Sequence, residues 1–447
     1  MLRQFIIEQS EADLISHAGL GLIGRALNEQ TDLGAQAKSA APARCDAIPH
    51  ADILKSYVAL LCLGKSDFEA INGMREEDYF AESLAVPQVP SEGTLRQRMD
   101  AHAPRFLPLV QDAAIEFLHR VDAPITPLEM GMVALDADVT PFDNSGTHKE
   151  GVSYTYKGMD GFAPMAIYLG QEGYCLELEM REGKQHCQKN TPQFLCRNLE
   201  RARRLTDKPV LLRLDSGNDA IENIDVVFEH NEQHPDDLPV HYLIKWNPRR
   251  EDHQHWLDYA EQHGEWSEPR PGKRVALFTV CETRTHNGYE YPLRRVMRLI
   301  ERSIDKSGQP LLLSEIEIEG WWTSLLREEQ QIIDLYADHG TSEQYHSEFK
   351  TDLDIERLPS GKFATNALVL GCAQLAYNIL RWIGQNGLLG SDAPPRHKAK
   401  RRRIRTVMQE LMYLAARLIR SGRRLKLAFG RSCLVVPIFR RLYLQLA

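Results

Sequence analysis

Apolar residues follow a helical spacing in the N-terminal region of the chain. Within residues 50–64 they are Ile53, Leu54, Tyr57, Leu60 and Leu61. Steps of three and four residues place such side chains on one face of a helix. A short segment and a Pro-bounded loop follow, and Ser91 is a suitable N-cap for a helix that carries Arg96 and Arg98. We therefore predict a mostly helical region over residues 1–125. Its order of elements is compatible with a helix-turn-helix unit that binds DNA, although small helical bundles without DNA partners have the same pattern.

Short apolar runs replace this spacing from about residue 126. The runs at 132–139, 209–217 and 240–246 are typical of strands. Residues 191–205 begin with Thr-Pro, a common helix start, and a second helix is expected at 218–230. With two further strands after the first, this order predicts a mixed α/β sheet over residues 126–246.

A β-rich insertion is expected over residues 247–324, before helical spacing returns. It contains Pro-rich turns and a hairpin candidate with Asn287-Gly288 at its centre. Residues 325–390 again have helical spacing. A short linker then leads into residues 391–447, which we expect to form a basic helical tail.

Charge is distributed unevenly along the chain. The net charge is −8, yet residues 396–447 hold 15 Lys or Arg against one acid, Glu410. This segment is therefore +14, and the remainder is −22. Such asymmetry indicates a nucleic-acid-binding tail on an acidic body. A basic tail that pairs with the acidic body would have the same composition.

Composition otherwise indicates an ordinary globular protein. Charged residues make up 26% and hydrophobic residues 43% of the chain. No uninterrupted apolar run reaches about 18 residues, so we expect no membrane span. The eight cysteines are scattered without a Cys-x-x-Cys pair, which indicates neither a zinc site nor a disulfide framework.

Aspartates stand at the ends of two predicted strands. Asp136 and Asp138 end the first strand, and Asp215 ends the strand at 209–217. Strand ends are where sites are built in open α/β sheets. Alternation places Asp136 and Asp138 on the same face, so periodicity alone leaves either as the candidate.

A helix after the insertion carries a polar stripe. Tyr336, His339, Glu343, His346 and Lys350 are spaced by three or four residues and form one continuous face of a helix. Together with the aspartates, Glu343 would complete a set of three carboxylates. Mg²⁺ prefers carboxylate oxygens, and two such ions about 4 Å apart can drive phosphodiester cleavage. Nearby Lys and Tyr side chains can hold flanking phosphates.

At these residues the chain resembles bacterial insertion-sequence transposases of the DDE type. Their group is marked by a Tyr-x-x-Arg-x-x-x-Glu-x-x-x-x-x-x-Lys helix, which here reads Tyr336, His339, Glu343 and Lys350. The Asp-Ser-Gly turn matches at Asp215. The Asp-x-Thr strand end matches at Asp138 and Thr140 and favours Asp138 over Asp136. The likeness covers residues 50–445.

The resemblance implies a fold and an activity. The fold would be a ribonuclease-H-like mixed sheet with a β-rich insertion before the final Glu. Asp138, Asp215 and Glu343 would hold two Mg²⁺ ions, which Mn²⁺ can replace. The protein would cut at the terminal inverted repeats of an element and join the 3′ ends to target DNA. It would act as a homodimer bridging two DNA ends, through its N-terminal helices, in the bacterial cytoplasm at the nucleoid.

Three residues on or near the signature helix depart from the family pattern or have two interpretations. His339 replaces the family's Arg and lacks its permanent charge and bidentate fork, which suggests a weakened copy or one that acts at mildly acidic pH. Trp322, next to Trp321, is a candidate for stacking on a flipped base, and a core aromatic pair is the simpler interpretation. Glu348 is expected to face solvent. The alternatives to a transposase are an inactive DNA-binding derivative, a structure-selective nuclease on the same fold and, less consistent with the basic tail, a phosphohydrolase.

Overall fold

The computed structural model describes residues 4–9, 11–40, 48–305, 307–394, 397–422 and 424–447. The chain forms two compact units, one from Met1–Ala123 with Glu348–Ala447 and one from Pro124–Ser347. The sequence segments 1–125 and 391–447, which we predicted as separate regions, therefore contribute to the same unit.

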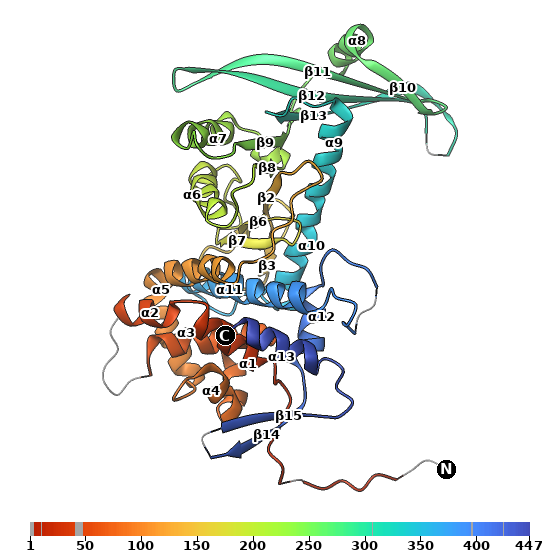
Figure 1. Cartoon of the computed structure of the whole chain (residues 1–447). Helices are drawn as coiled ribbons and strands as arrows, with labels where there is room; N and C mark the ends of the chain where they lie inside the picture. Colours follow the sequence, from red (N-terminus) through yellow and green to blue (C-terminus); the bar gives the residue numbers. More distant parts are fainter. Residues whose placement is uncertain (1–3, 10, 41–47, 306, 395–396, 423) are drawn as a thin grey trace. The chain divides into compact units, whose positions relative to one another are not determined.

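A nine-stranded mixed sheet is the centre of the second unit (Figure 1). Its order is β10-β11-β12-β13-β9-β8-β2-β6-β7. Strands β2, β8 and β9 are mutually parallel, and β6 runs antiparallel to β2. The five strands of the first part are β2 (Val133–Val139), β6 (Met165–Leu169), β7 (Tyr174–Glu179), β8 (Val210–Leu214) and β9 (Val240–Lys245). This arrangement confirms the predicted ribonuclease-H-like mixed sheet.

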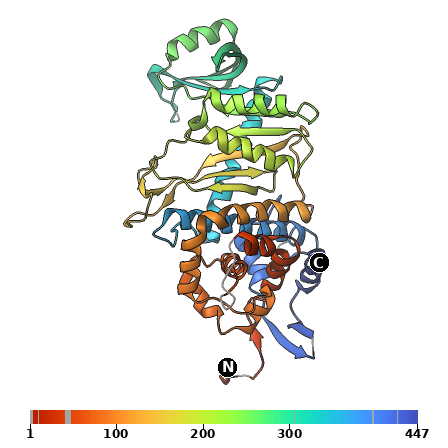
Figure 2. The same ribbon diagram turned by 90° about the vertical axis from the view of Figure 1, so that its left-hand side faces the viewer.

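Helices cover both faces of these strands. Figures 1 and 2 show α6 (Thr191–Arg203) and α7 (Ile221–Gln233) on one face. Helices α9 (Glu329–Ala337) and α10 (Ser342–Ser347) lie on the other (Figure 1). A buried apolar cluster joins α9 to the sheet, with Leu211 and Leu243 from the strands and Ile332 and Ile333 from the helix.

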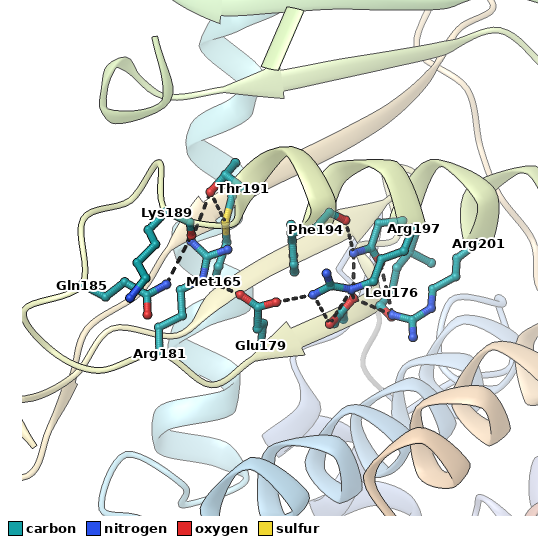
Figure 3. A network of polar contacts seen from close by, with 12 residues as sticks. Met165, Leu176, Glu179, Arg181, Gln185, Lys189, Thr191, Phe194, Arg197 and Arg201 are labelled. Atoms are coloured by element: carbon teal, nitrogen blue, oxygen red, sulfur yellow. Dashed lines mark hydrogen bonds and ion pairs between the residues drawn. The ribbon is translucent and has the colours of Figure 1, made fainter. Parts of the chain in front are cut away.

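Helix α6 is tied to strand β7 by a network of arginines and glutamates (Figure 3). The buried Glu177 accepts from Arg197 at 2.7 Å and from Arg201 at 2.6 Å. Glu179 accepts from Arg181 at 2.6 Å and also from Arg197. Burying Glu177 would be costly without these partners, so the network holds α6 in one position on the sheet.

The insertion extends the sheet rather than forming a separate body. It contains α8 (His253–His263), β10 (Glu265–Arg270), β11 (Lys273–His286), β12 (Tyr289–Ile304) and β13 (Pro310–Thr323). Strand β13 pairs with β9, where Trp321 lies opposite Lys245. The β11–β12 turn has positive φ at Asn287 (49°) and Gly288 (84°), as a two-residue type I′ hairpin requires. This confirms the predicted hairpin.

The first unit is mainly helical. Its helices are α1 (Leu20–Glu29), α2 (Leu33–Ala40), α3 (His50–Cys62), α4 (Asp78–Leu84), α5 (Glu92–Arg120), α11 (Phe363–Gly387), α12 (Ile404–Val407) and α13 (Val436–Gln445). A 3₁₀ helix at Phe68–Met74 separates α3 from α4. Ser91 caps α5 as predicted, because its side chain accepts from the Thr94 amide at 3.2 Å.

Helix α11 is long and apolar enough to cross a membrane by length and composition, but 83% of its most apolar window is buried inside the protein. Buried polar residues, including Asn366, Gln374 and Asn378, interrupt its sequence, so no continuous apolar run marks it. It packs against α5 and α3 as a core helix.

The prediction of a helical basic tail is wrong in part. After α12 and a π-helical turn at Met408–Met412, β14 (Ala416–Ser421) and β15 (Arg424–Phe429) pair as antiparallel strands. Strand β14 also pairs with β1 (Leu14–Ile15). Several tail arginines pair with acids of the same unit: Arg403 with Asp352, Arg420 with Asp78 and Glu82, and Arg441 with Asp392. Part of the +14 charge therefore pairs within the protein.

Candidate active site

The face of the sheet toward α9 changes from apolar to charged along β2 and β8. Ala134 lies opposite Leu211, and Asp136 lies opposite Arg213, in parallel register. Alternation then places Asp138 and Asp215 on the same face, one step further along each strand. Three layers result: an apolar pair in the core, an ion pair above it, and two carboxylates at the strand ends.

The ion pair between Asp136 and Arg213 is buried, and both side chains use their polar atoms in hydrogen bonds. Arg213 donates from Nε and Nη2 to the two Asp136 oxygens at 2.6 and 2.7 Å, and from Nη1 to the Leu335 carbonyl at 2.5 Å. His339 Nδ1 lies 2.9 Å from Asp136 Oδ1. Burial alone would raise the pKa of Asp136, but Arg213 and His339 outweigh it and hold that pKa below its usual value. Because both Asp136 oxygens are occupied, Asp138 is the better placed of the two aspartates to bind a metal.

Electrostatic interactions link Asp138 to Asp215 and to Glu343. Burial, and then Asp215, raise the pKa of Asp138 to about 6, and Glu343 adds to the shift. Asp138 Oδ1 accepts from the Val139 amide at 2.7 Å, and Asp215 Oδ1 accepts from Asn218 Nδ2 at 2.6 Å. Glu343 is exposed. Three neighbouring carboxylates offer negative charge and oxygen ligands, which suit a divalent hard cation, so the residues fit Mg²⁺ or Mn²⁺.

Helix α10 carries Glu343 and is anchored to the sheet by Tyr345, two residues further along the helix. The Tyr345 ring lies so close to Gly173 that a Cβ there would come within 2.2 Å of it. Gly173 also has φ +72°, and the Tyr345 hydroxyl donates to the Gln171 carbonyl at 3.2 Å. The turn between β6 and β7 thus fixes the position of α10, and with it that of Glu343, relative to the strand ends.

The polar stripe predicted on one continuous helix is divided among several helical forms. Tyr336 lies in the last turn of α9, His339 lies in a 3₁₀ turn (Asp338–Thr341), and Glu343 and His346 lie on α10. Lys350 is on a π-helical turn (Glu348–Asp352) that belongs to the first unit. His346 Nδ1 is 4.0 Å from Asp138 Oδ2. Burial, and then Asp215, raise the pKa of Tyr336, whose ring lies 5.4 Å from that of His339.

Other candidate residues lie elsewhere. Trp322 is fully buried, so it cannot stack on a base, and the core interpretation is confirmed. Glu348 is also buried, paired with Arg381, and the expectation of a solvated side chain is wrong. Arg96 and Arg98 are on α5 in the first unit, where Arg96 pairs with Glu92 at 3.0 Å and Arg98 lies 3.3 Å from His50.

Two residues beside the site, Arg213 and Tyr156, were not among those predicted. An arginine inside the apolar run 209–217 was a signal of a buried partner, since a charge is costly there when unpaired. The Tyr156 hydroxyl donates to the Val139 carbonyl at 3.2 Å, beside Asp138. It lies far from the strand ends in sequence, and no spacing pointed to it.

A separate group of side chains on α6 and α7 has the composition of a transition-metal site. His230 Nδ1 and His234 Nε2 lie 3.3 and 3.7 Å from Glu200 Oε1. All three ligand atoms lie within 4.8 Å of one another. Imidazole suits transition metals rather than Mg²⁺, and this group shares no residue with the three carboxylates.

A ribonuclease-H-like sheet with two aspartates at strand ends and a glutamate on a following helix defines a DDE-type protein. The family model described as transposase DDE domain group 1 matches residues 3–447, and the chain belongs to this family. Among solved structures, it is similar to a cryo-EM structure of a piggyBac transposase synaptic complex with hairpin DNA. That match has 10% identity and a TM-score of 0.42, and covers 97% of this chain and 84% of the other. No curated protein matches the chain.

Proposed function

We propose that this transposase cuts DNA at the terminal inverted repeats of an insertion sequence and joins the 3′ ends to target DNA. Asp138, Asp215 and Glu343 would hold two Mg²⁺ ions, with Mn²⁺ as a substitute. The observation that supports this most strongly is the placement of Asp138 and Asp215 at the ends of two adjacent parallel strands, with Glu343 on α10 near enough to add, after burial and Asp215, to the raised pKa of Asp138. When bound, the ions supply an activated attacking oxygen and a stabilised leaving oxygen.

The protein's own groups would set the geometry. The Val139 amide and Asn218 orient Asp138 and Asp215 through the hydrogen bonds described above. Arg213 ties β2, β8 and the end of α9 together through Asp136 and the Leu335 carbonyl. His339, held against Asp136, would position this layer rather than bind a phosphate, whereas Tyr336 and Lys350 remain candidates for phosphate contacts.

DNA recognition and assembly are further parts of the proposal. Arg96, exposed on α5, and Arg98 are candidates for contacts to the terminal repeat. A homodimer would bridge two element ends, and the protein would act in the bacterial cytoplasm at the nucleoid. A DNA-binding derivative without cleavage is the alternative suggested by His339 in the signature.

An excision assay tests this function. A plasmid carries a marker between the element's two ends, and the protein is supplied from a second plasmid. We expect excision and joining with wild type and with Asp258→Ala, a surface acid on α8 that serves as the matched control. Asp138→Ala, Asp215→Ala and Glu343→Ala should abolish both products. Excision that persists in any of the three would refute the assignment of the carboxylates, and wild type that binds the ends without excising would favour the inactive derivative.

A further inference from the structure

A rigid hairpin tip lies beside the carboxylates. Strands β4 (Ser153–Tyr154) and β5 (Asp160–Phe162) form the hairpin. The buried Thr155 closes its tip, because its amide and its hydroxyl both donate to the Met159 carbonyl at 2.9 Å. The Gly158 amide returns a bond to the Thr155 carbonyl at 3.0 Å. The backbone that carries residues 154–157 is therefore fixed.

This tip presents two aromatic side chains to solvent. Tyr154 is 67% exposed and Tyr156 is 68% exposed, on either side of Thr155. The Tyr156 hydroxyl is nevertheless anchored on the Val139 carbonyl, next to Asp138. Lys157 Nζ lies 6.0 Å from the centre of the same ring.

The chemistry of the tip suits a nucleotide. The metal ions proposed for the three carboxylates would attract the phosphates of the strand, and stacking would add a contact to its bases. A fixed aromatic face offers stacking to any base, because every base has a π-face. Trp322 cannot provide this, since it is fully buried.

We propose that the tip formed by Tyr154, Tyr156 and Lys157 binds the nucleotide next to the scissile phosphate, with its base stacked on Tyr156 and its phosphate near Lys157. This inference rests on the proposed function and adds a binding subsite to it. Stacking that is lost on removal of the ring should weaken binding of the cut end by about tenfold or more.

The test uses the full-length protein and a duplex carrying the element's terminal repeat, with an unpaired 2-aminopurine next to the cut. Binding is measured in Ca²⁺ and cleavage in Mg²⁺. Stacking quenches 2-aminopurine, so we expect Tyr156→Ala to lose the quenching and to bind about tenfold more weakly. Tyr156→Phe keeps the ring without its bond to the Val139 carbonyl and should retain most of the quenching and the binding. Tyr289→Ala, which removes a 70% exposed tyrosine on the insertion hairpin, is the matched control and should behave as wild type.

The outcomes separate this inference from the function on which it rests. If wild type cuts the duplex and Tyr156→Ala binds, quenches and cuts as wild type does, the subsite is refuted while the transposase function stands. If wild type produces no metal-dependent cut, the proposed function is overturned and the subsite with it. A thermal melt of Tyr156→Ala equal to that of wild type shows that any loss is not a loss of folding.

Discussion

Asp136 and Asp138 are two residues apart on β2, and their neutralisation should have opposite effects on stability. Asp136→Asn leaves the buried Arg213 without its carboxylate, and breaking a buried pair costs about 3 to 5 kcal/mol. Asp138→Asn removes a charge that the fold disfavours. Its pKa of about 6 lies roughly two units above the usual value, which corresponds to about 3 kcal/mol of destabilisation at neutral pH.

The pH dependence follows from the sign of this shift. Because the folded-state pKa of Asp138 is raised, its ionised form destabilises the metal-free protein above pH 6, and this cost disappears as the pH falls toward 4. The stability advantage of Asp138→Asn over wild type should therefore be present at pH 7 and nearly absent at pH 4.

Urea denaturation in EDTA measures these differences. We expect Asp138→Asn to unfold at a higher urea concentration than wild type at pH 7, and Asp136→Asn at a lower one. Added Mg²⁺ should stabilise wild type more than Asp138→Asn, since a ligand that binds only the folded state stabilises it. Equal destabilisation by both substitutions would refute the division of labour between the two aspartates.

Three further predictions concern the surroundings of the site and the core of the first unit. His339→Arg would place a second guanidinium against Asp136, whose oxygens already bind Arg213. It should lower the free energy of unfolding by about 1 to 3 kcal/mol and should not raise the cleavage rate between pH 6 and 8. A faster variant would show that His339 is a weakened phosphate ligand. Gly173→Ala would bring a Cβ into the Tyr345 ring at a residue with positive φ. Because Tyr345 and Glu343 both lie on α10, DNA cleavage should fall more than DNA binding. Unchanged cleavage would show that the contact between Gly173 and Tyr345 does not set the position of Glu343. Arg381→Met leaves Glu348 buried without its partner and should cost about 3 to 5 kcal/mol in urea denaturation, whereas a solvated Glu348 would give almost no change.

Local patterns in the sequence predicted the elements that carry the site. Apolar runs ending in aspartates marked β2 and β8, Asn287-Gly288 marked a hairpin, and Ser91 marked a helix start. Each of these signals lies within a few neighbouring residues, and none depends on which segments pack together.

The choice between Asp136 and Asp138 depends on tertiary structure. Both alternate onto the same face, and only the parallel register of β2 with β8 brings Arg213 onto Asp136. That register cannot be read from either strand alone. For the same reason the spacing aligned His339 with the signature but did not reveal that its partner is Asp136.

In the C-terminal region the basic charge was a stronger sequence signal than the pattern of the β-hairpin. Its basic charge suggested a helical tail, yet Ser421-Gly422 stands between two alternating runs and Gly422 has φ 58° in a hairpin. The pairing of β14 with β1 joins the two ends of the chain within one unit, a contact over 400 residues apart in sequence. No local pattern contains such information.

Cleavage of an end-labelled duplex carrying the element's terminal repeat tests the central claim most directly. Wild type and Asp258→Ala should cut at the end of the repeat only when Mg²⁺ or Mn²⁺ is present. Asp138→Asn, Asp215→Asn and Glu343→Gln should bind the duplex and leave it intact. Cleavage that survives in Asp138→Asn, or a wild type that binds without cutting in either metal, would contradict the account.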